Sequence, residues 1–225
     1  MLEALDMRRF GLIGGLVVTF GVLGGCQTPS TNTLGIYGDQ ALNAGNYDEA
    51  VTYYEQYVDR RPLDAEGRYK LAIAYLGADR VSMAREQFIL GLELKDDGRF
   101  VDGVADTLVD MGQQDELYKL LRQRAESTRS VEDYTRLGRF AAQVGDADGA
   151  EEALLLAAKL DGGQSIGPQL ELAELYGRFH DDANRLKRLR MALFIDPENK
   201  EVAEQIREMG EIPGPSFALV PAERG

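Results

Sequence analysis

A unit of about 34 residues occurs five times in succession between residues 31 and 199, and this repetition restricts the possible folds more than any other feature. We divide the segment into units at residues 31–64, 65–97, 98–130, 131–165 and 166–199. The eighth position of every unit is small, and the residues there are Gly38, Ala72, Ala105, Gly138 and Ala173. A unit of this size cannot bury its apolar face alone, so neighbouring units must stack on one another. The repetition therefore predicts a solenoid.

Each unit has the pattern of two amphipathic helices joined by a short turn. In the first unit, small or apolar residues recur at helical spacing as far as Ala41, are interrupted at Gly45, and resume at Ala50. A larger residue occupies one fixed position of each second helix, and these residues are Tyr54, Phe88, Leu121, Leu154 and Leu189. A small residue lets two helices approach closely, and a larger neighbour fills the space between them. We therefore expect antiparallel helix pairs.

The segment Gly45-Asn-Tyr-Asp-Glu-Ala50, followed by Pro62, resembles the tetratricopeptide repeat (TPR). The fifth unit repeats the resemblance with Leu172-Ala-Glu-Leu-Tyr176 and a closing Pro197. The resemblance covers residues 31–199, so five TPR-like repeats occupy the folded segment 34–199. It implies an all-α fold, a right-handed superhelical solenoid of antiparallel helix pairs.

The third and fifth units depart from the family pattern. Leu117 and Arg124 stand where the third unit should have small residues, and no proline ends that unit. Arg185 is at a normally small position of the fifth unit. Larger residues at close helix contacts force the helices apart. We therefore expect the helices of these two units to splay or to shift in register.

Two short segments follow the repeats. Residues 200–210 place Val202, Ala203, Ile206 and Met209 at helical spacing, which predicts a capping helix that covers the last repeat. Residues 211–225 contain three prolines around an apolar Phe-Ala-Leu-Val run. We expect a flexible tail there, and the alternative is a short strand or plug that docks on the protein's own groove or on a partner.

The first 25 residues have the layout of a secretory signal. Two arginines in Met7-Arg-Arg-Phe10 precede an apolar run that ends at Gly25. The run is shorter than the roughly 20 residues that a spanning helix needs, although a retained transmembrane helix stays an alternative. Glu3 and Asp6 are unusual in a signal's basic segment, which favours Met7 over Met1 as the translation start.

The segment Leu23-Gly-Gly-Cys26 resembles the lipobox of bacterial lipoproteins. The resemblance implies that signal peptide 1–25 is removed and that Cys26 receives a diacylglyceryl group and further acyl chains such as palmitate. Residues 26–33 would then form the lipidated start and a polar tether. Gln27 stands where an Asp commonly marks inner-membrane retention, so the resemblance implies an outer-membrane lipoprotein that faces the periplasm. An unmodified cysteine at the end of a signal is the alternative.

The net charge and the numbers of cysteine and histidine residues argue against several classes of ligand. The net charge of −13 opposes nucleic-acid binding, which needs clustered Lys and Arg, and favours basic partners. Cys26 and His180 are the only cysteine and histidine, so no nitrogen and sulfur ligand set for zinc is available. We expect His180 to be a solvated turn residue. No glycine-rich phosphate loop is present, and we expect no cofactor besides the covalent lipid on Cys26.

The resemblance to TPR proteins implies a binding groove on the concave face, lined mainly by the first helix of each pair. The groove positions of the family correspond here to Asp39, Asn43, Tyr69, Ile73, Asp102, Asp106, Asp110, Thr135, Arg139, Gln143, Glu174 and Arg178. Asp102, Asp106 and Asp110 recur every four residues and repel one another unless a cation lies opposite. Arg139 is the candidate internal cation. This acidic stripe is a solvated face, a docking surface for a basic segment, or a catalytic or cation site.

These features together predict a membrane-anchored scaffold for protein–protein interaction. Lipoproteins of this kind are assembly or adaptor factors for envelope complexes such as a pilus, a secretion machine or the outer-membrane machinery. We do not expect an enzyme, and the alternative is a cell-wall glycan hydrolase, or its direct regulator, that uses the acidic stripe. Self-association of the solenoid is a third hypothesis. The sequence decides neither the partner nor the oligomeric state.

Overall fold

The computed structural model describes residues 29–224, and these residues form eleven α-helices, one short 3-10 helix and no strand. The α-helices are α1 (Thr31–Asn43), α2 (Tyr47–Arg60), α3 (Ala65–Gly77), α4 (Val81–Leu94), α5 (Gly98–Asp110), α6 (Gln114–Thr128), α7 (Val131–Gln143), α8 (Ala147–Asp161), α9 (Gly167–Arg178), α10 (Asp182–Ile195) and α11 (Lys200–Glu208). The 3-10 helix is η1 (Ala222–Arg224). The all-α fold class predicted from the repeat is therefore confirmed, and each predicted unit contains one helix pair.

A residue next to or within the first turn explains where each first helix begins. Side-chain oxygens of Ser30, Asp64, Asp97 and Ser130 accept hydrogen bonds from backbone amides at the starts of α1, α3, α5 and α7. These bonds satisfy amides that have no partner inside the helix. Pro168 occupies the first turn of α9, where a missing N–H costs nothing.

The turn inside each pair has one repeated conformation. Its central residue has a positive φ of 59 to 86°, and in chain order it is Gly45, Asp79, Gly112, Gly145 and His180. Glycine adopts this conformation without strain, and Asp79 and His180 adopt it in the second and fifth units. His180 is exposed there, as expected for a turn residue.

The small eighth position lies at the contact between the two helices of a pair. A methyl group added at Gly38 would lie 2.7 Å from the ring of Tyr54, and one added at Gly138 would meet Leu154. Tyr54 and Leu154 are both buried. The small residue is therefore required because the large residue of the second helix fills the space above it.

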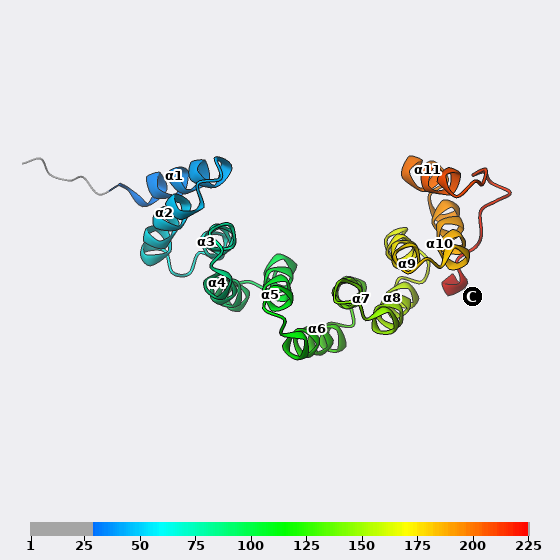
Figure 1. Cartoon of the computed structure of the whole chain (residues 1–225), viewed down its shortest axis with the longest axis horizontal. Helices are drawn as coiled ribbons and strands as arrows, with labels where there is room; N and C mark the ends of the chain where they lie inside the picture. The colour runs from blue at the N-terminus through cyan, green and yellow to red at the C-terminus, as the bar shows by residue number, and fades with distance from the viewer. Residues whose placement is uncertain (1–28, 225) are drawn as a thin grey trace, which may run out of the picture.

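The units follow one another along an arc (Figure 1). The first helices, α1, α3, α5, α7 and α9, line its inner side, and the second helices lie on its outer side. Buried apolar residues from α1 to α8 form one core cluster, and smaller clusters continue it to α11. The concave side is thus built from equivalent helices of successive units.

The third and fifth units keep their register, but the expected splaying occurs in the third unit, where α5 and α6 contact each other much less than the helices of every other pair do. The helices of the third unit begin at Gly98 and Gln114, at the same offsets as those of the first unit. Leu117 is fully buried, and Arg124 extends out of the helix contact to pair with Asp96 at 2.8 Å. In the fifth unit the side chain of Arg185 lies beside Gly177. A large residue in place of a small one thus spreads the helices of the third unit. The helices of the fifth unit stay close, because the long side chain of Arg185 can leave the contact.

The capping helix ends slightly earlier than predicted, at Glu208. Val202 and Ile206 of α11 are fully buried and pack against Ala173 and Leu189 of the fifth unit. The apolar face of the last repeat is therefore covered, as a solenoid requires at its ends.

The prediction of a flexible tail is wrong for residues 211–224, because this segment docks on the outer side of α10 (Figure 1). Arg190 donates to the carbonyl of Phe217 at 2.7 Å, and the amide of Leu219 donates to the carbonyl of Arg190 at 3.0 Å. Arg188 pairs with Glu223 at 2.6 Å, and both side chains are only 9% exposed. The buried guanidinium needs a counter-charge, and the tail supplies it. The tail docks on the helix pair and not in the concave groove.

The N-terminal predictions lie outside the described residues. Signal peptide 1–25, the lipidation site Cys26 and the first residues of the tether all precede Pro29. Among residues 29–224, no helix has the length and apolar character needed to cross a membrane.

Candidate partner-binding groove

One pocket of about 520 Å³ lies on the concave side, between α5, α7 and α9. Six of the groove residues predicted from the sequence line it: Asp102, Asp106, Arg139, Gln143, Glu174 and Arg178. Each helix contributes two of the six, four residues apart, because that spacing places side chains on one helix face. The structure thus brings together in one site residues that span more than two repeats.

The floor of the pocket is apolar. Phe140, Leu154 and Leu175 line it and are buried, with at most 4% of each residue exposed. A charged rim above an apolar floor suits Lys and Arg side chains, which pack an aliphatic stem and keep a charged head near water.

Two carboxylates at this pocket make no ion pair with any residue in the range 29–224. Partial removal from water raises the pKa of Asp106, and the charges of Asp102 and Asp110 raise it further. Burial also raises the pKa of Glu171 and outweighs the opposing effect of nearby Arg139. A raised carboxyl pKa means that the charged form lacks compensation, so a cation at this place would be stabilised. Glu171 was not predicted from the sequence. Its position three residues before Glu174 places the two side chains on the same helix face and could have indicated it.

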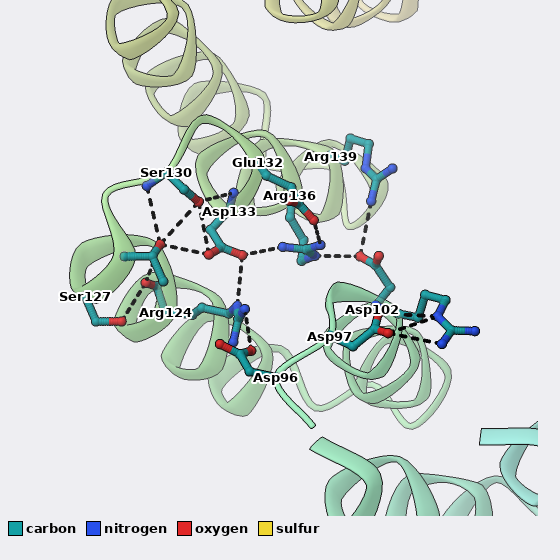
Figure 2. Close-up of polar contacts among 12 residues, drawn as sticks. Asp96, Asp97, Asp102, Arg124, Ser127, Ser130, Glu132, Asp133, Arg136 and Arg139 are labelled. Atoms are coloured by element: carbon teal, nitrogen blue, oxygen red, sulfur yellow. Dashed lines mark hydrogen bonds and ion pairs between the residues drawn. The ribbon is translucent and has the colours of Figure 1, made fainter. Parts of the chain in front are cut away.

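Asp102 differs from these two carboxylates because two arginines contact it. Arg136 donates from Nε to Oδ1 of Asp102 at 2.8 Å, and Arg139 donates from Nη2 to the same oxygen at 3.2 Å (Figure 2). The Arg136 side chain is 4% exposed, whereas that of Arg139 is 50% exposed. The prediction that Arg139 faces the acidic stripe is confirmed for Asp102, and the buried Arg136 was not predicted.

Arg136 belongs to an ionic network that joins the third and fourth units (Figure 2). It pairs with Asp133 and Glu132 on its own helix, and Arg124 of α6 pairs with Asp133 at 2.9 Å. Burial alone would raise the pKa of Asp133, but hydrogen bonds from Thr128 and Arg124 outweigh burial and hold that pKa below its usual value. This network fixes α5 against α7, and these two helices form one wall of the pocket.

Asp39, a predicted groove residue of the first unit, lies at a separate, smaller pocket of about 250 Å³. Asp39 accepts hydrogen bonds from the hydroxyl of Tyr54 and from Lys70, each at 2.6 Å. Burial raises the pKa of Asp39, but these two donors outweigh it and the pKa is lowered. Asp39 is therefore already compensated, unlike the free carboxylates of the central pocket.

The other predicted groove residues are not in the central pocket. Tyr69 lies between the rings of Phe88 and Phe100, with centroids 5.8 and 5.7 Å away, and Ile73 packs against the core. The remaining positions, Asn43 and Asp110, are exposed, and Thr135 is half-buried. Tyr69 and Ile73 therefore contribute to packing of the units.

Carboxylates, arginines, Gln143 and apolar side chains line the central pocket, and no Ser, Thr, Cys, His or Lys is among them. In the part of the chain that the structure describes, no group of three His, Cys, Asp or Glu side chains is arranged to hold a metal ion.

Comparisons with known proteins agree with this architecture. Residues 38–97 match the family model described as tetratricopeptide repeat. No curated protein matches the sequence significantly. The solved structure of the MamA protein is 19% identical with a TM-score of 0.52, and the match covers 85% of this chain and 98% of that one. A thermophilic TPR protein of Thermus thermophilus is 21% identical with a TM-score of 0.52, covering 80% and 98%.

A third structure, MamA from residue 41 to the end from Desulfovibrio magneticus RS-1, is 17% identical with a TM-score of 0.52. That match covers 76% of this chain and 97% of the other. At these identities the likeness is one of fold. The repeated helix pairs, the match of the first two units and the shared architecture show that this chain folds as a TPR-like solenoid.

Proposed function

We propose that this protein is a scaffold whose concave groove binds an extended, basic segment of a partner protein. The observation that carries the proposal is the central pocket, in which the free carboxylates of Asp106 and Glu171 lie above an apolar floor. Lys or Arg side chains of a basic segment would compensate these two charges and cover the floor with their stems. TPR solenoids are scaffolds for protein–protein interaction, and their curved surfaces suit extended segments.

The charge of the whole chain supports the same class of partner. A net charge of −13 creates a negative potential that attracts basic segments and speeds their encounter with the groove. Salt screens such steering, so binding should weaken as ionic strength rises.

Binding of a labelled hexalysine peptide tests this proposal, with hexaglutamate as the control peptide. The full chain, purified in a non-ionic detergent because of its apolar N-terminal run, is titrated against each peptide, and fluorescence anisotropy is measured. We expect the affinity for hexalysine to exceed that for hexaglutamate by about tenfold or more, and to fall between 50 and 200 mM salt. Equal affinity for the two peptides, or no binding of either, would contradict the proposal.

We further propose that a lipid on Cys26 anchors the scaffold to the periplasmic face of an outer membrane. Two sequence features support this proposal. The segment Leu23-Gly-Gly-Cys26 resembles a lipobox, and the residue after the cysteine is Gln27 instead of Asp. Only five positions separate Cys26 from the start of α1 at Thr31, so an extended tether would reach about 17 Å. The scaffold would then act close to the membrane, as an assembly or adaptor factor for an envelope complex such as a pilus or secretion machine.

The substitution Cys26→Ser tests the anchor. We expect the variant to keep its first 25 residues, because the thiol that accepts the lipid is missing and cleavage depends on lipid attachment. Mass spectrometry of the purified chain should therefore show an uncleaved precursor without acyl chains. A variant that is processed and partitions into the membrane like the unchanged chain would exclude lipidation at this position.

A further inference from the structure

Two arginines contact Asp102. Arg136 and Arg139 both donate to the same carboxylate oxygen, Oδ1. The buried Arg136 is held in place by Asp102 and by its neighbours Asp133 and Glu132. Asp102 therefore keeps an ion pair with Arg136 when Arg139 moves away.

The contact of Arg139 is also the weaker of the two. Its distance to Asp102 is 3.2 Å against 2.8 Å for Arg136, and half of its side chain is exposed. Exposed ion pairs compete with water and cost side-chain entropy, so they hold a long side chain only loosely. Arg139 can leave Asp102 without exposing an unpaired buried charge.

The guanidinium of Arg139 acts on the free carboxylates of the pocket as well. Burial raises the pKa values of Asp106 and Glu171, and the positive charge of Arg139 opposes this increase at both carboxyls without cancelling it. It also lines the pocket itself. The positive charge of Arg139 thus cancels part of the negative potential that would attract a basic ligand.

We propose that Arg139 is a built-in competitor for the basic segment that the groove binds. Without a partner, Arg139 partly neutralises the pocket. A partner's Lys or Arg takes its place near Asp106 and Glu171, and the Arg139 side chain moves toward solvent. This inference rests on the proposed function and adds its regulation. It predicts that removal of a residue that lines the binding site increases the affinity for the ligand, whereas such removal usually decreases affinity.

Arg139 also sets a charge requirement for the partner. The displaced guanidinium remains on α7 and still repels cations, so a single positive charge gains little by entering the pocket. A segment with several basic residues gains additional contacts with the acidic surface and overcomes this repulsion. The groove should therefore discriminate against partners with one isolated cation.

The test compares hexalysine binding by the full chain and three variants. Arg139→Gln removes the competitor, Arg139→Lys keeps its charge, and Lys119→Gln removes the same charge from an exposed position on α6. We expect Arg139→Gln to bind about three to ten times more tightly than the unchanged chain, because a nearby positive charge is lost. Arg139→Lys and Lys119→Gln should stay within about twofold. Circular dichroism should be unchanged, since Asp102 keeps Arg136.

The possible results separate this inference from the proposed function. If hexalysine binds but Arg139→Gln binds equally or more weakly, Arg139 is no competitor, although the groove still binds basic segments. If Lys119→Gln tightens binding as much as Arg139→Gln, the effect is one of net charge and the inference also fails. If no form of the chain prefers hexalysine to hexaglutamate, the proposed function itself is wrong.

Discussion

Replacing Arg136 with methionine is expected to lower the free energy of unfolding by about 3 kcal/mol, although methionine fills most of the same volume. The guanidinium is 4% exposed and is held by Asp102, Asp133 and Glu132. Without it, Asp133 stays buried beside Arg124 alone, and the junction of the third and fourth units loses its shared cation. Because Arg124 and Thr128 still donate to Asp133, the loss should lie at the low end of the range for broken buried ion pairs.

Urea unfolding followed by circular dichroism measures this effect, with Arg139→Gln as the matched control. Arg139 lies one turn further along the same helix and contacts the same carboxylate, but it is half exposed. We expect the control to lose less than about 1 kcal/mol, as exposed ion pairs usually do. An Arg136→Met variant as stable as the control would show that the network does not hold the units together.

The second large effect is expected at the docked tail. Glu223→Gln removes the negative charge that compensates Arg188 and leaves this guanidinium with neutral amide acceptors such as Gln169, at 3.0 Å. Burial raises the pKa of Glu223, but the hydrogen bond and charge of Arg188, together with hydrogen bonds from the Glu223 backbone amide and from Gln169, outweigh burial and lower that pKa. The carboxylate is therefore stabilised in its charged form. We expect the tail to lose about 3 kcal/mol of docking free energy.

Hydrogen exchange of the Leu219 amide reports tail docking directly, because this amide donates to the carbonyl of Arg190. A loss of about 3 kcal/mol corresponds to exchange that is roughly 100-fold faster in Glu223→Gln. Glu211→Gln is the control, since Glu211 is an exposed residue of the same segment. Equal exchange in both variants would mean that the ion pair does not hold the tail.

Acid should release the tail as well. The folded-state pKa of Glu223 lies below its ordinary value of 4.5, so this carboxylate stabilises docking at pH values above 4.5. Its contribution falls as the pH drops below 4.5 toward the lowered pKa. The effect of Glu223→Gln on Leu219 exchange should therefore shrink in the same pH range.

The helices and their pairing could be predicted because their causes are local or periodic. The positive-φ turn at Gly45 and the small Gly138 act within one unit, and Asp64 caps the helix that begins at the next residue, so a single sequence displays all three. The groove face followed from the resemblance to the tetratricopeptide repeat, whose groove positions recur on each first helix. Six predicted residues therefore meet in one pocket.

The ionic contacts could not be predicted in the same way because apolar periodicity does not register them. Arg136 and Arg188 are charged residues on buried helix faces, and a pattern of apolar residues treats them as interruptions. Arg136 nevertheless meets Asp102, 34 residues earlier, which is one repeat period. Comparison of opposite charges one period apart would have found this pair. The pair of Arg188 with Glu223 has no such signal, because Glu223 lies beyond the repeats and its place depends on how the tail docks.

The affinity of hexalysine for two doubly substituted chains tests the central claim most directly. Asp106→Asn with Glu171→Gln neutralises the two free carboxylates of the pocket, and Asp115→Asn with Glu116→Gln removes the same charge from exposed positions on α6. We predict that the first pair of substitutions weakens binding by about tenfold or more and that the second changes it by less than about twofold. Equal losses from the two pairs would show that hexalysine responds to net charge alone, and would contradict a binding site in the concave groove.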